Sequence, residues 1–311
     1  MRLLATGLIL ILAGVLAAQD APKKKKKVRL PFKWVNKLPA NAPKEVKHAT
    51  FRSPSMGVEV GYCIYLPAQY AANKKKRFPV VYYLHGGRPG SEIKSIKLVP
   101  WIHEAMKAGK VAPALYVFVN GGPVSHYNMG KKGQMGEDVF IKELIPHVDA
   151  TYRTIPRREG RALEGFSQGG RGTARIMFRH PHLFVSVAPG GGGHATEKRI
   201  SEEGGRESDK LIFAEGYNTW DLARKYARNP KPKLNILVHV GNKGFNYQNN
   251  LEWMEHLKQL KISFEHLIIP DAPHSATKIY EKKGLEIMRF HAANFKKALS
   301  SKQNGGSDSG G

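Results

Sequence analysis

The chain has 311 residues, of which 41% are hydrophobic and 9% aromatic. It can therefore bury a sizeable core, and general disorder is excluded. A single cysteine, Cys63, excludes an internal disulfide, and its apolar neighbours favour a buried structural thiol. The net charge of +25 favours anionic partners, although it also fits a well-solvated surface.

The first residues have the pattern of a secretory signal. Arg2 precedes an apolar stretch from Leu3 to Leu16, and small residues suited to signal peptidase follow. The alternative is a retained membrane anchor, but the stretch is shorter than the roughly 20 residues that span a bilayer. We expect residues 1–18 to be cleaved and the protein to be exported, to the periplasm or outside the cell.

Residues 19–45 are expected to form a flexible basic arm. The run PKKKKKV at Pro22 to Val28 resembles a nuclear-import signal, but a segment behind an export signal would not meet the import machinery. The arm suits an anionic polymer, and no sequence-specific nucleic-acid binding is expected. The body of the chain is basic as well.

Residues 46–298 alternate between strand and helix patterns. VKHATFR and VEVGYCIYLP flank a turn and predict a hairpin, and the apolar runs Phe78–Leu84 and APALYVFV predict buried strands. SIKLVPWIHEAMKAGK and GEDVFIKELIPHVDATYRT predict amphipathic helices.

The second half of this region continues in the same way. RALEGF, FVSVAPGGGG, LNILVHVG and SFEHLIIP predict strands; GGRGTARIMFRH, NLEWMEHLKQL and YEKKGLEIMRFHAANFKKAL predict helices. Such alternation indicates an α/β fold, with a mostly parallel central sheet covered by helices on both faces. The polar, glycine-rich residues 299–311 are expected to be disordered.

Gly165-Phe-Ser167-Gln-Gly169 matches the GxSxG motif of serine hydrolases. The motif alone is weak, but here a predicted strand enters it and a predicted helix leaves it. Glycines permit such a tight turn, which projects the serine hydroxyl above the sheet edge. Ser167 is therefore the candidate nucleophile.

Acyl transfer also needs two N–H donors for the oxyanion of the tetrahedral intermediate. Gln168 directly follows the nucleophile, and Gly87 in YLHGGRPG follows an earlier strand, so their backbone N–H groups are the candidates. The alternative for His85-Gly86-Gly87 is an ordinary turn in which His85 packs structurally.

A serine nucleophile needs a base, which follows it along the chain in this kind of fold. Of the 13 histidines, His274 fits best, since IIPDAPHSATKIY places it after the last strand and before the final helix.

With these residues, the chain resembles the esterase D and feruloyl esterase group of α/β-hydrolases over roughly residues 46–298. The similarity rests on KRFPVVYYLHGG, FIKELIPHVDATYRT and EGFSQGG. It implies an α/β-hydrolase fold, Ser167 as nucleophile, His274 as base, and Gly87 and Gln168 as the oxyanion hole. It also implies acyl or feruloyl esters on polysaccharide as substrates.

The third triad member departs from the family pattern. The relatives have a carboxylate in a GxxD segment, where this chain has Gly241-Asn-Lys-Gly244. Three candidates for this position remain: Asp271, in the same loop as His274; Asp221, in the excursion between two core strands (residues 190–229); and the uncharged Asn246. A missing acid is compatible with a slow enzyme.

The histidines show no HExxH or paired spacing, so we expect no catalytic metal and no cofactor. We expect a serine esterase that works through an acyl-enzyme. Two alternatives are a degenerate hydrolase that only binds an anionic glycan or surface, and an acyltransferase on the same scaffold. The sequence does not indicate an oligomeric state.

Overall fold

The computed structural model describes residues 31–129 and 134–301. The chain divides into residues 1–31 and residues 32–311, and everything below concerns the second unit. The predicted signal (residues 1–18), arm residues 19–30 and tail residues 302–311 lie outside the described residues. Among the described residues, no helix has the length and apolarity needed to cross a membrane.

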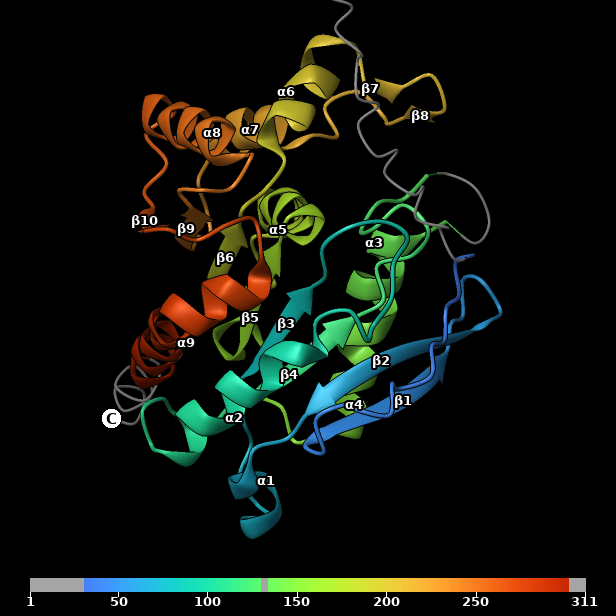
Figure 1. The fold of residues 1–311 in the computed structure, drawn as a ribbon, viewed down its shortest axis with the longest axis vertical. Helices are drawn as coiled ribbons and strands as arrows, with labels where there is room; N and C mark the ends of the chain where they lie inside the picture. The colour runs from blue at the N-terminus through green and yellow to red at the C-terminus, as the bar shows by residue number, and fades with distance from the viewer. Residues whose placement is uncertain (1–30, 130–133, 302–311) are drawn as a thin grey trace, which may run out of the picture. The chain divides into compact units, whose positions relative to one another are not determined.

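An eight-stranded sheet forms the centre of the fold (Figure 1). Its strands in spatial order are β1 (Val46–Arg52), β2 (Glu59–Tyr65), β4 (Leu115–Val119), β3 (Val80–Leu84), β5 (Arg161–Phe166), β6 (Ser186–Gly190), β9 (Asn235–Gly241) and β10 (Glu265–Ile269). β1, β2 and β4 pair antiparallel, and the strands from β4 to β10 pair parallel. The mostly parallel sheet predicted from the sequence is therefore present.

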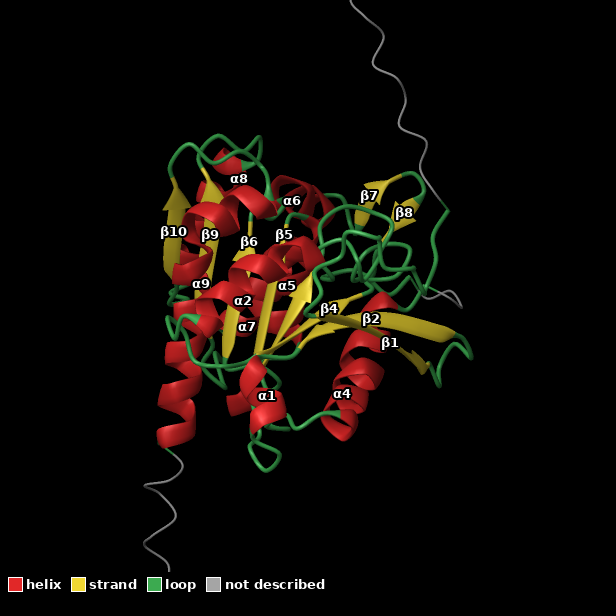
Figure 2. Ribbon diagram, turned by 60° about the horizontal axis from the view of Figure 1, so that its bottom comes forward, coloured by secondary structure: helices red, strands yellow, loops and turns green. Residues whose placement is uncertain are grey.

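Helices cover both faces of the sheet, as Figure 2 shows. The helices are α1 (Ala68–Ala72), α2 (Val99–Lys107), α3 (Gly136–Asp138), α4 (Ile145–Thr151), α5 (Gln168–Arg179), α6 (His194–Glu202), α7 (Thr219–Ala227), α8 (Tyr247–Gln259) and α9 (Ala276–Ser300), with short 3₁₀ or π turns η1 (Ile96–Leu98), η2 (Val139–Leu144) and η3 (Arg158–Gly160). The helix predicted near residues 136–154 is thus built from α3, the π-helical η2 and α4.

The strand alternation divides the core into two layers. Along β3, Val80 and Tyr82 belong to the cluster that packs against α5, α7 and α8, whereas Val81 and Tyr83 belong to the cluster under α2 and α9. Successive side chains of a strand point to opposite faces, so a strand buried on both sides must be apolar throughout. This explains the continuous apolar runs of the central strands.

The excursion between β6 and β9 contains elements that the sequence patterns did not predict. It carries α6, α7 and a small antiparallel hairpin of β7 (Arg206–Ser208) and β8 (Leu211–Ile212). Figure 1 shows these elements beside α5 and beyond the end of β6. The excursion therefore lies near the carboxyl ends of the parallel strands.

Part of the predicted flexible arm packs against the body. The carbonyl of Trp34 accepts a hydrogen bond from the Gly61 N–H at 2.8 Å, and the Asn36 N–H donates to Glu92 at 2.7 Å. The side chain of Asn120 also donates to the carbonyl of Lys33. Residues 33–36 of the predicted arm therefore have hydrogen-bond partners on β2 and in the loops beside it.

Candidate active site

Ser167 occupies the turn between β5 and α5. Its backbone has φ 62° and ψ −114°, a conformation that non-glycine residues rarely adopt. The flanking glycines allow close packing, since a Cβ on Gly169 would overlap the carbonyl of Leu84. The chain therefore makes the sharp strand-to-helix turn expected of a nucleophile elbow.

His274 lies in the loop between β10 and α9. Its Nε2 is 2.8 Å from Ser167 Oγ, which is hydrogen-bonding distance. The imidazole lies close to the rings of Phe166 and Phe245, with centroid distances of 4.8 and 4.2 Å. Burial lowers the pKa of His274 below its ordinary 6.5. The ring is therefore neutral near pH 7 and able to accept a proton.

Asn246 holds the other side of this imidazole. Its Oδ1 is 3.1 Å from His274 Nδ1. Its Nδ2 donates to the carbonyls of Gly191 and Gly192. Because carbonyls only accept hydrogen bonds, the amide oxygen must face His274. An oxygen acceptor in turn requires the ring proton on Nδ1, which leaves the Nε2 lone pair for Ser167.

The two carboxylate candidates lie elsewhere. The Asp221 carboxylate, on α7, contacts Ser201, Asn218 and Arg224. Asp271 is exposed, and its backbone N–H donates to Asn242. Of the three candidates for the third position, the structure brings only Asn246 to His274.

The loop with Gly87 lies directly beside Ser167. An ideal Cβ on Gly86 would be 3.2 Å from the Ser167 Cβ, and Gly87 has φ 70°. Gln168 is the first residue of α5, whose N-terminal N–H groups have no partners within the helix. The two predicted oxyanion donors therefore belong to segments that meet at Ser167.

Several side chains hold this loop in place. Ser125 Oγ donates to the Gly87 carbonyl at 2.7 Å, and the Lys94 ammonium donates to Pro89 O. His85 Nε2 accepts the backbone N–H groups of Ser91 and Gly121. Burial lowers the pKa of His85 to about 3, so it is a neutral structural acceptor.

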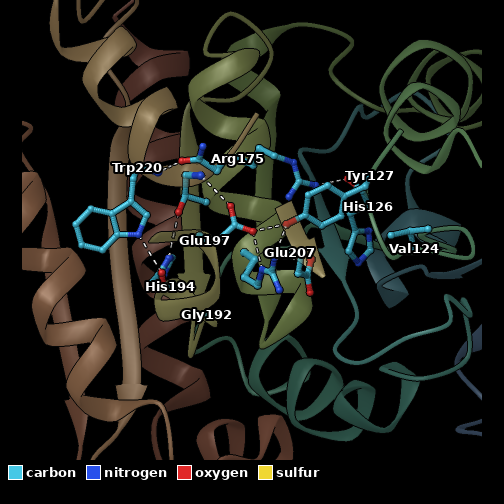
Figure 3. Close-up of polar contacts among 12 residues, drawn as sticks. Val124, His126, Tyr127, Arg175, Gly192, His194, Glu197, Glu207 and Trp220 are labelled. Atoms are coloured by element: carbon cyan, nitrogen blue, oxygen red, sulfur yellow. Dashed lines mark hydrogen bonds and ion pairs between the residues drawn. The ribbon is translucent and has the colours of Figure 1, made fainter. Parts of the chain in front are cut away.

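A partly buried cluster of charged side chains joins the excursion to α5 and the Gly87 loop, and Figure 3 shows Tyr127, Glu197 and Glu207 of this cluster. Glu207, on β7, makes two hydrogen bonds to Arg88 at 2.8 and 3.0 Å and contacts Arg171 at 3.3 Å. Arg171 also donates to Glu197 and Tyr127, at 2.6 and 2.8 Å. Burial acts to raise the pKa of Glu207, but the two arginines outweigh it and lower that pKa to about 2.

Sequence reasoning missed this cluster and also missed Phe245. Phe245 is 83% exposed, although its ring lies against His274. Two signals were present: Arg171 and Arg175 in the mostly small and apolar segment GGRGTARIMF, and the aromatic Phe245 in the polar segment GNKGFNYQNN. Neither signal identifies a partner without the tertiary structure.

Within the described residues, no group of three or more His, Cys, Asp or Glu side chains could hold a metal ion.

Comparison with known proteins supplies independent information. The model of the family described as "Putative esterase" matches residues 53–267. An esterase of Mycobacterium tuberculosis is 28% identical over 195 residues, 59% of this chain and 42% of its own length. An endo-1,4-beta-xylanase/feruloyl esterase of Xylanibacter ruminicola is 30% identical over 148 residues, 45% of this chain and 20% of its own. The chain thus spans less than half of these relatives.

Solved structures share the fold. A ferulic acid esterase superposes with a TM-score of 0.66 at 20% identity, covering 80% of this chain and 98% of its own. An S-formylglutathione hydrolase of Staphylococcus aureus gives 0.63 at 19% identity, with the same coverage. These neighbours are α/β-hydrolases, which confirms the fold class predicted from the sequence.

Proposed function

The chain belongs to the esterase family, and on this premise we propose that it hydrolyses carboxylic esters through a covalent acyl-enzyme on Ser167. The observation that carries the proposal is the 2.8 Å hydrogen bond between Ser167 Oγ and His274 Nε2 at a strand-to-helix turn. A serine hydroxyl needs such a base to become a useful nucleophile.

The reaction follows from this geometry. As Ser167 Oγ attacks the ester carbonyl, its proton passes to His274 Nε2, and the negative oxygen is stabilised by the N–H groups of Gly87 and Gln168. The imidazolium then gives that proton to the departing alkoxide, which leaves as an alcohol. Water attacks the acyl-enzyme and again loses a proton to His274 Nε2. The bond between Ser167 Oγ and the acyl carbon then breaks, His274 returns the proton to Oγ, and the carboxylic acid is released.

Asn246 has a positioning role in this reaction. In serine proteases, replacing the triad aspartate by asparagine costs about 10⁴ in rate because the imidazole takes the wrong tautomer. Here the amide nitrogen is occupied by two glycine carbonyls, so the oxygen accepts from Nδ1 and keeps the productive tautomer. Only the charge of the usual carboxylate is lost, and we expect a moderately slowed enzyme.

Labelling with a fluorophosphonate tests the proposal. Wild-type protein should react covalently, and Ser167→Ala should not. Ser300→Ala, a change at the exposed end of α9, should label like wild type. Failure of correctly folded wild type to label would favour a degenerate hydrolase that only binds a ligand, a reading that the neutral Asn246 would suit.

For the substrate, we infer acyl or feruloyl esters carried on polysaccharide. The xylanase/feruloyl esterase relative and the ferulic acid esterase neighbour support this class. The exposed ring of Phe245 supports it too, since it offers a flat apolar surface beside His274. Phe245→Ala should raise KM for methyl ferulate more than for methyl acetate. Equal changes for both esters would remove the aromatic-stacking argument.

Transfer of the acyl group to a sugar hydroxyl instead of water is a variant of the same chemistry. Product analysis with and without added oligosaccharide distinguishes the two, because a transferase would form a new sugar ester.

The signal pattern of residues 1–18 supports export, and the basic run that follows supports contact with an anionic polymer. Removing residues 19–30 from the mature protein should weaken binding to an anionic polysaccharide without changing hydrolysis of a small soluble ester. Equal polymer binding by the two forms would exclude this role for the arm.

A further inference from the structure

A cavity lies at the end of the sheet opposite Ser167. Its volume is about 220 Å³, and its lining includes Val81 at the start of β3, Ala114 just before β4, and Met288 and Phe295 of α9. These strand positions are at the amino ends of the parallel strands, whereas Ser167 follows the carboxyl end of β5. In Figure 1, the C-terminal half of α9 lies beside the segment that follows α2, and residues of both line the cavity.

The wall of the cavity is apolar. Val81, Met106, Tyr116, Met288 and Phe295 line it, and each is at most 4% exposed. An apolar cavity of about 150 Å³ stays dry and can hold a benzene ring. A cavity of about 220 Å³ therefore has room for an alkyl chain.

One histidine also belongs to the wall, but its nitrogens face protein groups. His291 Nδ1 is 2.8 Å from Ser186 Oγ, and its Nε2 is 3.6 Å from a Glu164 oxygen. Nδ1 is therefore satisfied by Ser186, whereas Nε2 makes no hydrogen bond among the described residues.

The exposed part of the lining carries positive charge. Lys76, Arg77 and Lys296 line the cavity and are exposed, and the described lining contains no Asp or Glu. Arg77 donates to the carbonyl of Thr154, and no ion pair is found for these three side chains among the described residues. An apolar interior below unpaired cations is complementary to a molecule with an alkyl chain and an anionic head.

We propose that this cavity binds a medium-chain alkyl carboxylate, with its chain between α9 and the sheet and its carboxylate at Lys76, Arg77 and Lys296. The site is independent of the catalytic proposal, because it shares no residue with the groups around Ser167. Occupation would anchor the C-terminal half of α9 to the loop before β3.

A chain-length series gives the first test. Titration calorimetry of unbranched carboxylates from six to twelve carbons should show about fourfold tighter binding per added methylene until the cavity is full, and a plateau beyond. Decanol should bind at least about tenfold more weakly than decanoate, and added salt should remove most of that difference. An affinity that depends on neither chain length nor the charge of the head group would overturn the proposal.

Two variants locate the site. Ala292→Trp fills the cavity and Lys296→Glu reverses a charge at its mouth; each should weaken decanoate binding at least about tenfold. Lys47→Glu, the same charge change on β1, is the matched control and should bind normally. If Ala292→Trp fails to fold, judged by circular dichroism, the surface variant Lys296→Glu still decides.

Binding at the catalytic site is the main alternative outcome. Enzyme labelled with fluorophosphonate, or the Ser167→Ala variant, should bind decanoate as well as wild type does. Hydrolysis of a small soluble ester should be unchanged in Lys296→Glu. Loss of decanoate binding on blocking Ser167, together with normal binding by Lys296→Glu, would assign the ligand to the catalytic site and contradict the proposal.

Discussion

The Oδ1 atom of Asn246 lies 3.1 Å from Nδ1 of His274, while Nε2 of the same ring lies 2.8 Å from Ser167 Oγ. If this amide were rotated by 180°, its oxygen would face the carbonyl oxygens of Gly191 and Gly192, and no hydrogen bond could form between them. The orientation of the imidazole is therefore controlled by hydrogen bonding to the main chain that follows β6.

Replacing Asn246 tests this relationship. Asn246→Ala removes the acceptor for Nδ1–H, and we expect kcat/KM to fall about 10²-fold or more. Asn246→Asp should raise the pKa of His274, because a carboxylate stabilises the imidazolium. The same change should lower the free energy of unfolding by about 1–3 kcal/mol, since the carboxylate would face two carbonyl oxygens without a donor.

Asn250→Ala is the matched control. Asn250 also donates to the Gly192 carbonyl, one turn later on α8, but makes no hydrogen bond to His274. This variant should have a lower free energy of unfolding, whereas its kcat/KM should fall at the same acidic pH as that of wild type. If Asn246→Asp also leaves the pH of this fall unchanged, Asn246 does not position His274.

The pH dependence of kcat/KM reports the state of His274 in the free enzyme. Burial lowers the pKa of this imidazole, so the ring stays neutral to lower pH than an exposed histidine does. Activity should therefore fall only as the pH drops below about 6.5, the ordinary value. A midpoint at or above 6.5, measured with a neutral soluble ester, would show that burial does not control this group.

Glu207 should matter to the rate although it is on the excursion. Glu207→Gln weakens the paired hydrogen bonds to Arg88, the residue after Gly87, and should lower kcat several-fold with little change in KM. Asp209→Asn is the control in the same hairpin, because this carboxylate is 99% exposed. Equal kcat values for the two variants would mean that the excursion does not hold the Gly87 loop.

The glycine after Gln168 should be essential for folding. Gly169→Ala would drive a Cβ into the Leu84 carbonyl, and we expect a loss of more than about 3 kcal/mol in the free energy of unfolding, or no folded protein. Gly109→Ala is the comparison: this residue has φ 66° and open space around it, so only about 1–2 kcal/mol of backbone strain is expected. Urea unfolding measures both, and similar losses would contradict the close approach of α5 to β3.

Much of the fold was predictable from the sequence because the central strands are buried on both faces and therefore read as continuous apolar runs. The hydrogen bond between Ser167 and His274 was anticipated for a related reason: chain order and the strand–turn–helix context limit where a nucleophile and its base occur. Their catalytic roles are proposals that the kinetic experiments address.

Other parts depended on tertiary contacts. Of Asp221, Asp271 and Asn246, only Asn246 contacts His274, and the carbonyls of Gly191 and Gly192 after β6 fix its orientation. No local sequence pattern reveals these contacts. The short helices α6 and α7 and the Glu207 cluster are stabilised by partners far apart in the sequence. Residues 31–45 looked like a continuation of the basic arm, because only their contacts with β2 and its neighbouring loops distinguish them.

The formation of an acyl-enzyme on Ser167 is the central claim, and rapid mixing with an excess of a p-nitrophenyl ester tests it most directly. We predict a burst of nitrophenol close to one equivalent per enzyme, an added acyl mass on the peptide that contains Ser167, and neither signal in Ser167→Ala. Steady hydrolysis without a burst or a modified peptide, retained in Ser167→Ala, would contradict the account.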